Sequence, residues 1–84
     1  MSAQTKKDSN WTLESCEVLR SERIDGKNRI DLRVVKWERA ERPVLEKRRI
    51  WEREDRDRPT KTVGLTADDV RYIYEHYPEI INLL

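Results

Sequence analysis

The chain has 84 residues, of which 42% are charged and 36% are apolar, whereas about a quarter of the residues in an average soluble protein are charged. A chain of this length forms at most one domain and buries only about 60% of the surface that it exposes when unfolded, which excludes an enzyme with a large core and a deep internal pocket. The 18 Lys and Arg nearly balance the 17 Asp and Glu, and three Trp, three Tyr and recurring Val, Ile and Leu favour a folded domain over a disordered chain.

The cysteine count and the hydropathy pattern indicate the cellular compartment. Cys16 is the only cysteine, which excludes an intramolecular disulfide and a cysteine-rich zinc site and favours a reducing environment. No apolar run approaches the roughly 18 residues that a membrane span needs, and the first residues lack the apolar stretch of a secretory signal. We therefore expect a cytoplasmic protein with no membrane partner.

Positive charge is concentrated in the middle of the chain. Residues 20–61 hold 15 Lys and Arg against 10 Asp and Glu, whereas residues 1–19 have a net charge of −1 and residues 62–84 a net charge of −3. Local charge, not net charge, sets the local electrostatic potential. The nature of a partner is therefore judged from residues 20–61.

The first half of the chain predicts a tail, two strands and a hairpin. Residues 1–10 are polar and aperiodic, so we expect a mobile tail. Alternation from Trp11 to Leu19 favours a first strand. The dipeptide Asp25-Gly26 indicates a turn, because glycine tolerates a positive φ and aspartate supports a turn through its side chain. Residues 29–37, RIDLRVVKW, alternate with period two and predict a second strand.

Two further strands are expected before the helix. A third strand is predicted over residues 43–52, paired antiparallel with the second, and Pro43 is tolerated because it comes first. Residues 52–60 are dense in charge and contain a proline near their end, so we expect a solvated loop there. A short strand is predicted over residues 61–65.

A helix is expected to start at Thr66. An acid follows Thr66 three residues later, a pair that satisfies free amides at a helix start, and Asp68 and Asp69 favour its positive end. Pro78 is expected to end or kink the helix, and residues 79–84 are expected to resume as a helical turn. One apolar stripe at helical spacing comprises Val70, Ile73, Tyr74 and Tyr77.

These elements predict an α+β fold, a four-stranded antiparallel sheet followed by a C-terminal helix, in one domain over residues 11–84. The helix stripe, with Ile80 and Ile81, supplies more apolar surface than one thin sheet can cover. We therefore predict a homodimer whose seam includes Val70, Ile73, Tyr74 and Tyr77.

Catalytic patterns are absent from the sequence. His76 is the only histidine and Cys16 the only thiol, and neither belongs to a recognisable nucleophile motif. The acids of residues 54–57 are interleaved with arginines, whose charges oppose cation binding. The two glycines lie in a turn and beside a strand end, so there is no glycine-rich phosphate loop. We therefore expect no enzyme, no metal and no cofactor.

Basic and aromatic residues alternate along the second and third predicted strands. Residues of equal parity share a strand face, so Arg33 lies with Trp37, and Lys47 and Arg49 lie with Trp51. Two tryptophans on neighbouring strands, interleaved with cations, offer a ring for each unstacked base and a charge for each phosphate of single-stranded nucleic acid. Core tryptophans and a solvated sheet face are the alternative interpretation. The opposite face of the second strand, with Ile30, Leu32 and Val34, can receive the helix stripe.

The order of features in residues 33–69 is specific. An aromatic residue ends one strand, a hairpin follows, and the next strand carries arginines and ends in tryptophan. A charged loop then leads to a lysine and a short strand, and a threonine followed by acidic residues starts the helix. In this order, RVVKWERAERPVLEKRRIWEREDRDRPTKTVGLTADD resembles the single-stranded DNA-binding family of the transcriptional coactivator called positive cofactor four, particularly its short bacterial members. The resemblance covers roughly residues 13–84.

The resemblance implies a strongly curved sheet, a helix that packs across a two-fold axis, and a groove for single-stranded DNA in each protomer. Trp37 and Trp51 correspond to the stacking aromatics of the family, Arg48 to its third-strand arginine and Lys61 to the lysine before its fourth strand. Arg48 has the opposite parity to Trp51, so either a bulge brings the two together or Arg49 contacts the phosphate.

We therefore expect sequence-independent binding of single-stranded DNA by a nucleoid-associated homodimer that supports transcription regulation, replication or repair. RNA binding, and a protein-interaction module that docks on the transcription machinery through tryptophan hot spots, are the alternatives. The candidate nucleic-acid contacts are Trp37, Trp51, Arg33, Lys47, Arg48, Arg49 and Lys61.

Overall fold

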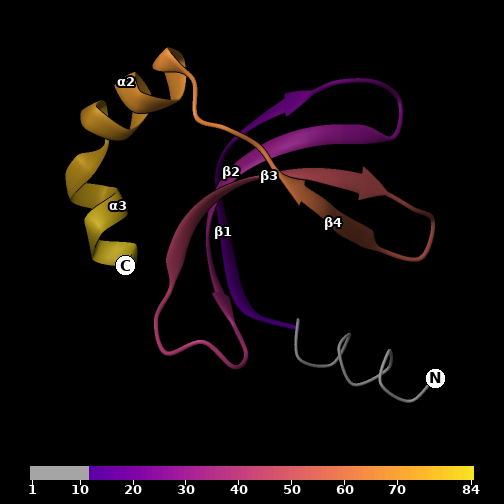
Figure 1. The fold of residues 1–84 in the computed structure, drawn as a ribbon, viewed down its shortest axis with the longest axis horizontal. Coiled ribbons are helices and arrows are strands. Elements are labelled where there is room, and N and C mark those ends of the chain that lie inside the picture. The colour runs from indigo at the N-terminus through magenta and orange to yellow at the C-terminus, as the bar shows by residue number, and fades with distance from the viewer. Residues whose placement is uncertain (1–11) are drawn as a thin grey trace.

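The computed structural model describes residues 12–84, which form four strands followed by two helices (Figure 1). The elements are β1 (Leu13–Arg23), β2 (Asn28–Trp37), β3 (Val44–Glu52), β4 (Asp57–Thr62), α2 (Ala67–Glu75) and α3 (Tyr77–Leu83). This confirms the α+β class and the antiparallel sheet with helix after it. The predicted tail, residues 1–10, and the predicted start of the first strand at Trp11 lie outside the described residues.

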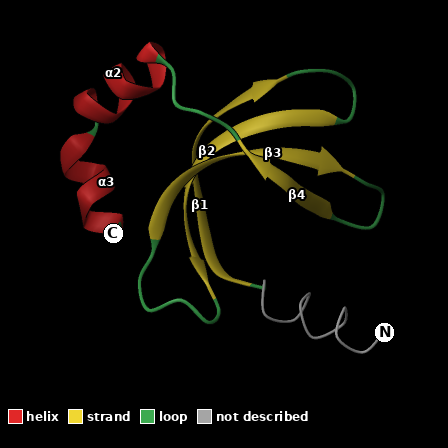
Figure 2. Cartoon of the chain, viewed as in Figure 1, coloured by secondary structure: helices red, strands yellow, loops and turns green. Residues whose placement is uncertain are grey.

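The four strands form one antiparallel sheet in the order β1-β2-β3-β4. The turn predicted at Asp25 joins β1 to β2, where the Asp25 carboxylate accepts hydrogen bonds from the Lys27 backbone N–H and the Asn28 side chain. The register shifts twice between β1 and β2 and once between β3 and β4. Such shifts bend a strand and increase its twist, and the sheet is strongly curved (Figures 1 and 2).

The segment predicted as a solvated loop, residues 52–60, is a loop over residues 53–56 and strand at both ends. Glu52 belongs to β3, β4 already begins at Asp57, and Pro59 lies opposite Ile50 in the ladder. Proline lacks an N–H group but is tolerated in β4, because this strand lies at the edge of the sheet. All six residues of β4 are exposed, so β4 carries none of the apolar alternation by which a strand is predicted. The strand predicted over residues 61–65 ends at Thr62.

The helix start at Thr66 is confirmed by a complete capping box. The Thr66 hydroxyl accepts a hydrogen bond from the Asp69 backbone N–H, and the Asp69 carboxylate accepts one from the Thr66 backbone N–H. The helix breaks at His76, and Pro78 lies in the first turn of α3, where a missing N–H costs nothing. Residues 77–83 thus form a second helix, longer than the single turn expected for residues 79–84.

The helices run along one side of the curved sheet (Figure 2). Polar contacts hold α2 there. The Tyr72 hydroxyl donates to the Leu19 carbonyl at 3.1 Å, and Lys47 Nζ donates to Asp69 Oδ2 at 2.5 Å. The Arg20 guanidinium lies over the Tyr72 ring, donates to the Asp68 carbonyl at 3.3 Å and lies 3.9 Å from the Asp69 carboxylate. The buried apolar side chains are few: Leu32, Val34, Val35, Ile50 and Ile80. Polar contacts therefore supplement a small apolar core.

Candidate nucleic-acid interface

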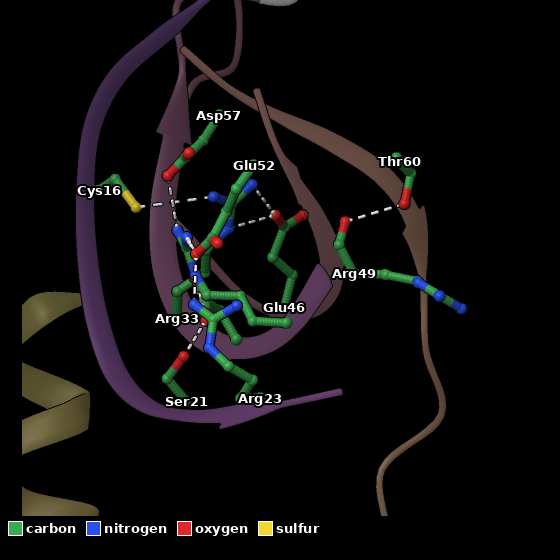
Figure 3. A network of polar contacts seen from close by, with 11 residues as sticks. Cys16, Ser21, Arg23, Arg33, Glu46, Arg49, Glu52, Asp57 and Thr60 are labelled. Atoms are coloured by element: carbon green, nitrogen blue, oxygen red, sulfur yellow. Dashed lines mark hydrogen bonds and ion pairs between the residues drawn. The ribbon is translucent and has the colours of Figure 1, made fainter. Parts of the chain in front are cut away.

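The pairing of β2 with β3 assigns each side chain to one of two sheet faces. Directly paired residues share a face, and alternate residues along a strand point to opposite faces. The inner face, which lies inside the curve of the sheet (Figure 3), carries Arg29, Asp31, Arg33, Val35 and Trp37 of β2 and their partners Val44, Glu46, Arg48 and Ile50 of β3. The outer face carries Asn28, Ile30, Leu32 and Val34 of β2 and their partners Leu45, Lys47, Arg49 and Trp51 of β3.

The two tryptophans predicted to stack bases lie on opposite faces and at opposite ends of the β2–β3 pair. Trp51 pairs with Asn28 at the start of β2, whereas Trp37 ends that strand. The expectation that they form one basic and aromatic surface is therefore wrong. Parity decides which residues of one strand share a face. Across strands the faces depend on the register, which is set by the length of the hairpin and pairs the even residues of β2 with the odd residues of β3.

The register also settles which arginine shares a face with Trp51. Pairing between β2 and β3 is regular, and the bulge near Arg48 places its extra residue in β4 and not in β3. Arg48 therefore stays on the inner face, where its guanidinium lies 5.6 Å from the centre of the Trp37 ring. Arg49 is on the side of Trp51.

A buried ion pair occupies the middle of the inner face. Arg33 Nε donates to Glu46 Oε2 at 2.9 Å, and Arg48 Nε donates to the same oxygen at 3.0 Å. Arg33 Nη2 also lies 2.8 Å from this oxygen without the alignment of a hydrogen bond, and Arg33 Nη1 lies 3.8 Å from the Cys16 sulfur. Burial acts to raise the pKa of Glu46, but the hydrogen bonds and charges of Arg48 and Arg33 lower it overall.

A second charged cluster lies on the same face beside the first (Figure 3). Arg29 contacts the carboxylates of Asp31, Glu52 and Asp57, and Arg23 donates to Glu52 at 2.7 Å. The Ser21 hydroxyl donates to Asp31, which is fully buried. The four arginines of the inner face, Arg23, Arg29, Arg33 and Arg48, are thus matched by four carboxylates, Asp31, Glu46, Glu52 and Asp57. This face offers little net attraction to a phosphate.

The inner-face network makes a prediction about pH. Hydrogen bonds from Arg23 and Arg29 lower the pKa of Glu52 from 4.5 to about 2, and the pKa of Glu46 is lowered as well. A carboxylate whose pKa is depressed by folding stabilises the fold above its unfolded pKa and loses that contribution as the pH falls toward its folded pKa. We expect the urea midpoint to be constant near neutral pH and to fall between about pH 4.5 and about pH 2. A midpoint that stays constant through this window contradicts the network.

Lys47, another predicted phosphate contact, is part of the sheet–helix junction. Its ammonium group bonds to the Asp69 carboxylate, and the two side chains are 10% and 6% exposed. Burial acts to raise the pKa of Asp69, but hydrogen bonds from Lys47 and Thr66 lower it overall. Lys47 therefore stabilises the start of α2 and is not available to a strand that crosses the outer face.

Three cations that form no ion pair with the described residues, Arg49, Arg58 and Lys61, gather around Trp51 on β3 and β4. Arg49 is half-buried, and the charges of Arg49 and Arg58 help to lower the pKa of Asp25 and of Asp55, respectively. The Trp51 side chain is exposed and pairs across the sheet with Arg58, and Arg49 lies two residues before it on the same face. Lys61 is exposed on β4, and Arg49 points away from the inner-face network (Figure 3). Within residues 12–84, the side chains of Arg49, Arg58 and Lys61 make no hydrogen bond or ion pair. Arg58 was missed because residues 52–60 were assigned to a loop.

An open hollow of about 640 Å³ adjoins Trp51. Its lining comes from the end of β3, the β3–β4 turn and the β1–β2 turn: Lys27, Trp51, Glu52, Arg53, Glu54 and Asp55. The Arg53 guanidinium lies 4.9 Å from the centre of the Trp51 ring, a cation–π contact. The surface around Trp51 therefore combines an aromatic platform, a recess and free cations.

The predicted dimer residues divide between two sides of the helical segment. Ile73 is half-buried and Ile80 is buried, whereas Tyr74 is 82% exposed. Five exposed apolar residues follow one another at intervals of four and three residues across the break at His76: Val70, Tyr74, Tyr77, Ile81 and Leu84. Leu83 is also exposed but lies outside this spacing. Such spacing places them on one continuous stripe. Val70, Tyr74 and Tyr77 thus remain accessible, and Ile73 faces the protomer.

The structure of residues 12–84 also bears on metal ligands, on membrane-spanning helices and on His76. This part of the chain has no group of three or more His, Cys, Asp or Glu placed to hold a metal ion. None of its helices is both long enough and apolar enough to cross a membrane. The His76 ring stacks on Tyr72, and its Nδ1 lies 3.0 Å from the Tyr72 carbonyl.

Comparison with known proteins adds no relative. No family model matches the chain, and neither a curated protein nor a solved structure matches it.

Proposed function

We propose that the protein binds single-stranded DNA with little sequence preference, as a homodimer, through the outer surface around Trp51. The observation that carries the proposal is the exposed Trp51 ring, flanked by Arg49, Arg58 and Lys61, whose side chains form no ion pair within residues 12–84. An exposed ring stacks on any base, and free cations neutralise phosphates without reading sequence. The resemblance to the positive cofactor four family supports the same function.

The proposal gives different roles to the candidate contacts. Trp51, Arg49 and Lys61 contact the strand, joined by Arg58. Arg33, Arg48 and Lys47 hold the fold through their ion pairs with Glu46 and Asp69. Trp37 packs beneath Arg48 at the end of the inner face. A phosphate could reach Arg33 only if the buried ion pair between Arg33 and Glu46 first opened. Opening this pair would leave a buried charge unpaired, which costs several kcal/mol of free energy.

Loss of single cations tests the phosphate contacts. We expect Arg49→Ala and Lys61→Ala each to weaken binding equally for all strand sequences. Each phosphate contact contributes about 0.7 to the logarithmic salt slope of single-strand binding, so each substitution should flatten the slope by about that amount. Fluorescence anisotropy at several salt concentrations measures both quantities.

The control for these variants is Arg42→Ala. Arg42 is also an exposed cation but lies in the β2–β3 turn, at the end of β3 remote from Trp51. Its loss should leave the salt slope unchanged. Equal effects at Arg42, Arg49 and Lys61 would show that attraction is diffuse and that the surface around Trp51 is not the site.

The dimer in this proposal forms through the exposed apolar stripe on α2 and α3. An exposed contiguous stripe of this kind marks an interaction surface, and a second copy offers an identical stripe across a two-fold axis. We expect the parent to sediment as a dimer and Tyr74→Asp to sediment as a folded monomer, because Tyr74 is 82% exposed in the protomer. The control is Asn82→Asp, which introduces an aspartate at another exposed position of the helical segment, and this variant should remain a dimer. A monomeric parent contradicts the proposal.

The same stripe favours a second candidate function, docking on another protein such as a subunit of the transcription machinery. The two functions differ in salt dependence. A phosphate-driven complex weakens steeply as salt rises, whereas an interface anchored by tyrosine and valine does not. RNA binding shares the stacking chemistry, so an RNA strand of equal length belongs in the same anisotropy series. Transcription, replication and repair all provide single-stranded DNA for the proposed activity.

A further inference from the structure

The hollow beside Trp51 contains a polar pair that the binding of phosphates does not use. Of its three carboxylates, Glu52 accepts hydrogen bonds from Arg23 and Arg29, and Asp55 lies 3.7 Å from Arg53. The Glu54 carboxylate and the Lys27 ammonium group have no side-chain partner within residues 12–84. The hollow thus presents one free hydrogen-bond acceptor and one free donor next to an aromatic ring.

The charge of the hollow selects a base and not a phosphate. Its lining carries two cations, Lys27 and Arg53, against three carboxylates. Because Glu52 is already bonded to Arg23 and Arg29, Lys27 and Arg53 balance the other two carboxylates and leave no excess positive charge to attract a phosphate, whereas the backbone of a bound strand finds cations on β3 and β4. A neutral base has no charge to repel, and its flat face can stack on the face of the Trp51 ring that the Arg53 guanidinium does not cover.

The free pair is complementary to one base in particular. Guanine has two adjacent donors, N1–H and the N2 amino group, which one carboxylate accepts together, and its O6 and N7 atoms accept from a lysine. Thymine has a single N–H flanked by two carbonyl oxygens, which repel a carboxylate. Cytosine and adenine each offer an amino group without an adjacent imino N–H. The combination of Glu54, Lys27 and the Trp51 ring therefore fits guanine best.

We infer that the hollow is a subsite for one unpaired guanine, which stacks on Trp51 while Glu54 accepts from its N1–H and N2 amino group and Lys27 donates to O6 or N7. This inference rests on the proposed binding of single-stranded DNA. It adds a base preference at one position of a strand that is otherwise bound through its phosphates. Glu54 and Lys27 are the residues that confer the preference.

The test uses the full chain and oligonucleotides of about 15 nucleotides, within the usual site sizes for single strands. All positions are thymidine except the central one, which is thymidine, guanosine or inosine. Inosine keeps the ring and N1–H of guanosine but lacks the N2 amino group, so it separates hydrogen bonding from stacking. We expect the guanosine strand to bind at least about fivefold more tightly than the thymidine strand, and the inosine strand to lose a clear part of this gain.

The variant Glu54→Gln isolates the carboxylate. It removes one negative charge, so affinity for all strands can rise together, but the difference between guanosine and inosine should disappear. Glu38→Gln, an exposed acid in the β2–β3 turn, should leave that difference intact. Two results overturn the subsite but not the proposed function. The first is equal binding of the three strands by the parent protein, and the second is a preference for guanosine over inosine that persists in Glu54→Gln. An all-thymidine strand that does not bind overturns both.

Discussion

Removal of the Glu46 carboxylate, in Glu46→Ala, should lower the free energy of unfolding by about 3–5 kcal/mol, the usual cost of leaving one partner of a buried ion pair unpaired. Only 6% of the Arg33 side chain and 10% of the Glu46 side chain are exposed. The substitution leaves the Arg33 charge inside the curve of the sheet with no carboxylate in contact, and Arg48 loses its partner as well. Urea unfolding followed by tryptophan fluorescence measures the loss.

Two further variants make this prediction specific. Glu14→Ala removes the carboxylate of the Lys36–Glu14 pair, in which Glu14 is 55% exposed, and should cost less than about 1 kcal/mol. The double variant Arg33→Met with Glu46→Leu replaces both charges by apolar groups and should recover most of the stability lost in Glu46→Ala. If Glu46→Ala costs no more than Glu14→Ala, Arg33 is free enough to contact phosphates and its structural role is rejected.

The second large effect concerns binding. Trp51→Ala should weaken single-strand binding by about 1–3 kcal/mol, the usual cost of losing one stacking platform, which is about 5-fold to 150-fold in Kd. The fold should be retained, because Trp51 is 41% exposed and the buried residue beside it, Ile50, points to the opposite face. Fluorescence anisotropy with a labelled strand gives the affinity, and circular dichroism checks the fold.

Trp37→Ala is the matched control for Trp51→Ala. Trp37 lies on the inner face beneath Arg48, so its loss should lower the urea midpoint and leave the affinity of the folded protein nearly unchanged. The opposite pattern, in which Trp37→Ala abolishes binding and Trp51→Ala does not, would move the DNA to the inner face. The charged network there would then have to open for binding.

The sequence was sufficient to predict the elements whose signals are local. The Asp25-Gly26 turn, the strand β2 and the capping box at Thr66 were each predicted from residues close together in the chain, and each is present in the structure, although β2 is buried on both faces over residues 31–35. β4 was not predicted correctly, because an edge strand with both faces in solvent carries no apolar alternation. The break at His76 was anticipated from Pro78, but α3 begins one residue before that proline and runs to Leu83.

The candidate site was harder to predict, because its geometry depends on pairs distant in sequence. Parity placed Arg33 with Trp37 and Arg49 with Trp51, but only the register between β2 and β3 shows that these two pairs lie on opposite faces. The acidic partners of the cations could not be predicted either, because they are distant in sequence. Arg29 contacts Glu52, 23 positions away, and Lys47 contacts Asp69, 22 positions away. A count of arginines and lysines therefore overestimates the number of cations that form no ion pair.

The measurement that tests the central claim most directly is the binding of fluorescent single-stranded and double-stranded DNA of equal length to the parent protein and to Trp51→Ala, at low and moderate salt. The account predicts that the single strand binds more tightly than the duplex, that binding weakens as salt rises, and that Trp51→Ala loses about 1–3 kcal/mol of single-strand affinity. Equal affinity of the parent and Trp51→Ala for the single strand, or no binding of either strand at low salt, would contradict it.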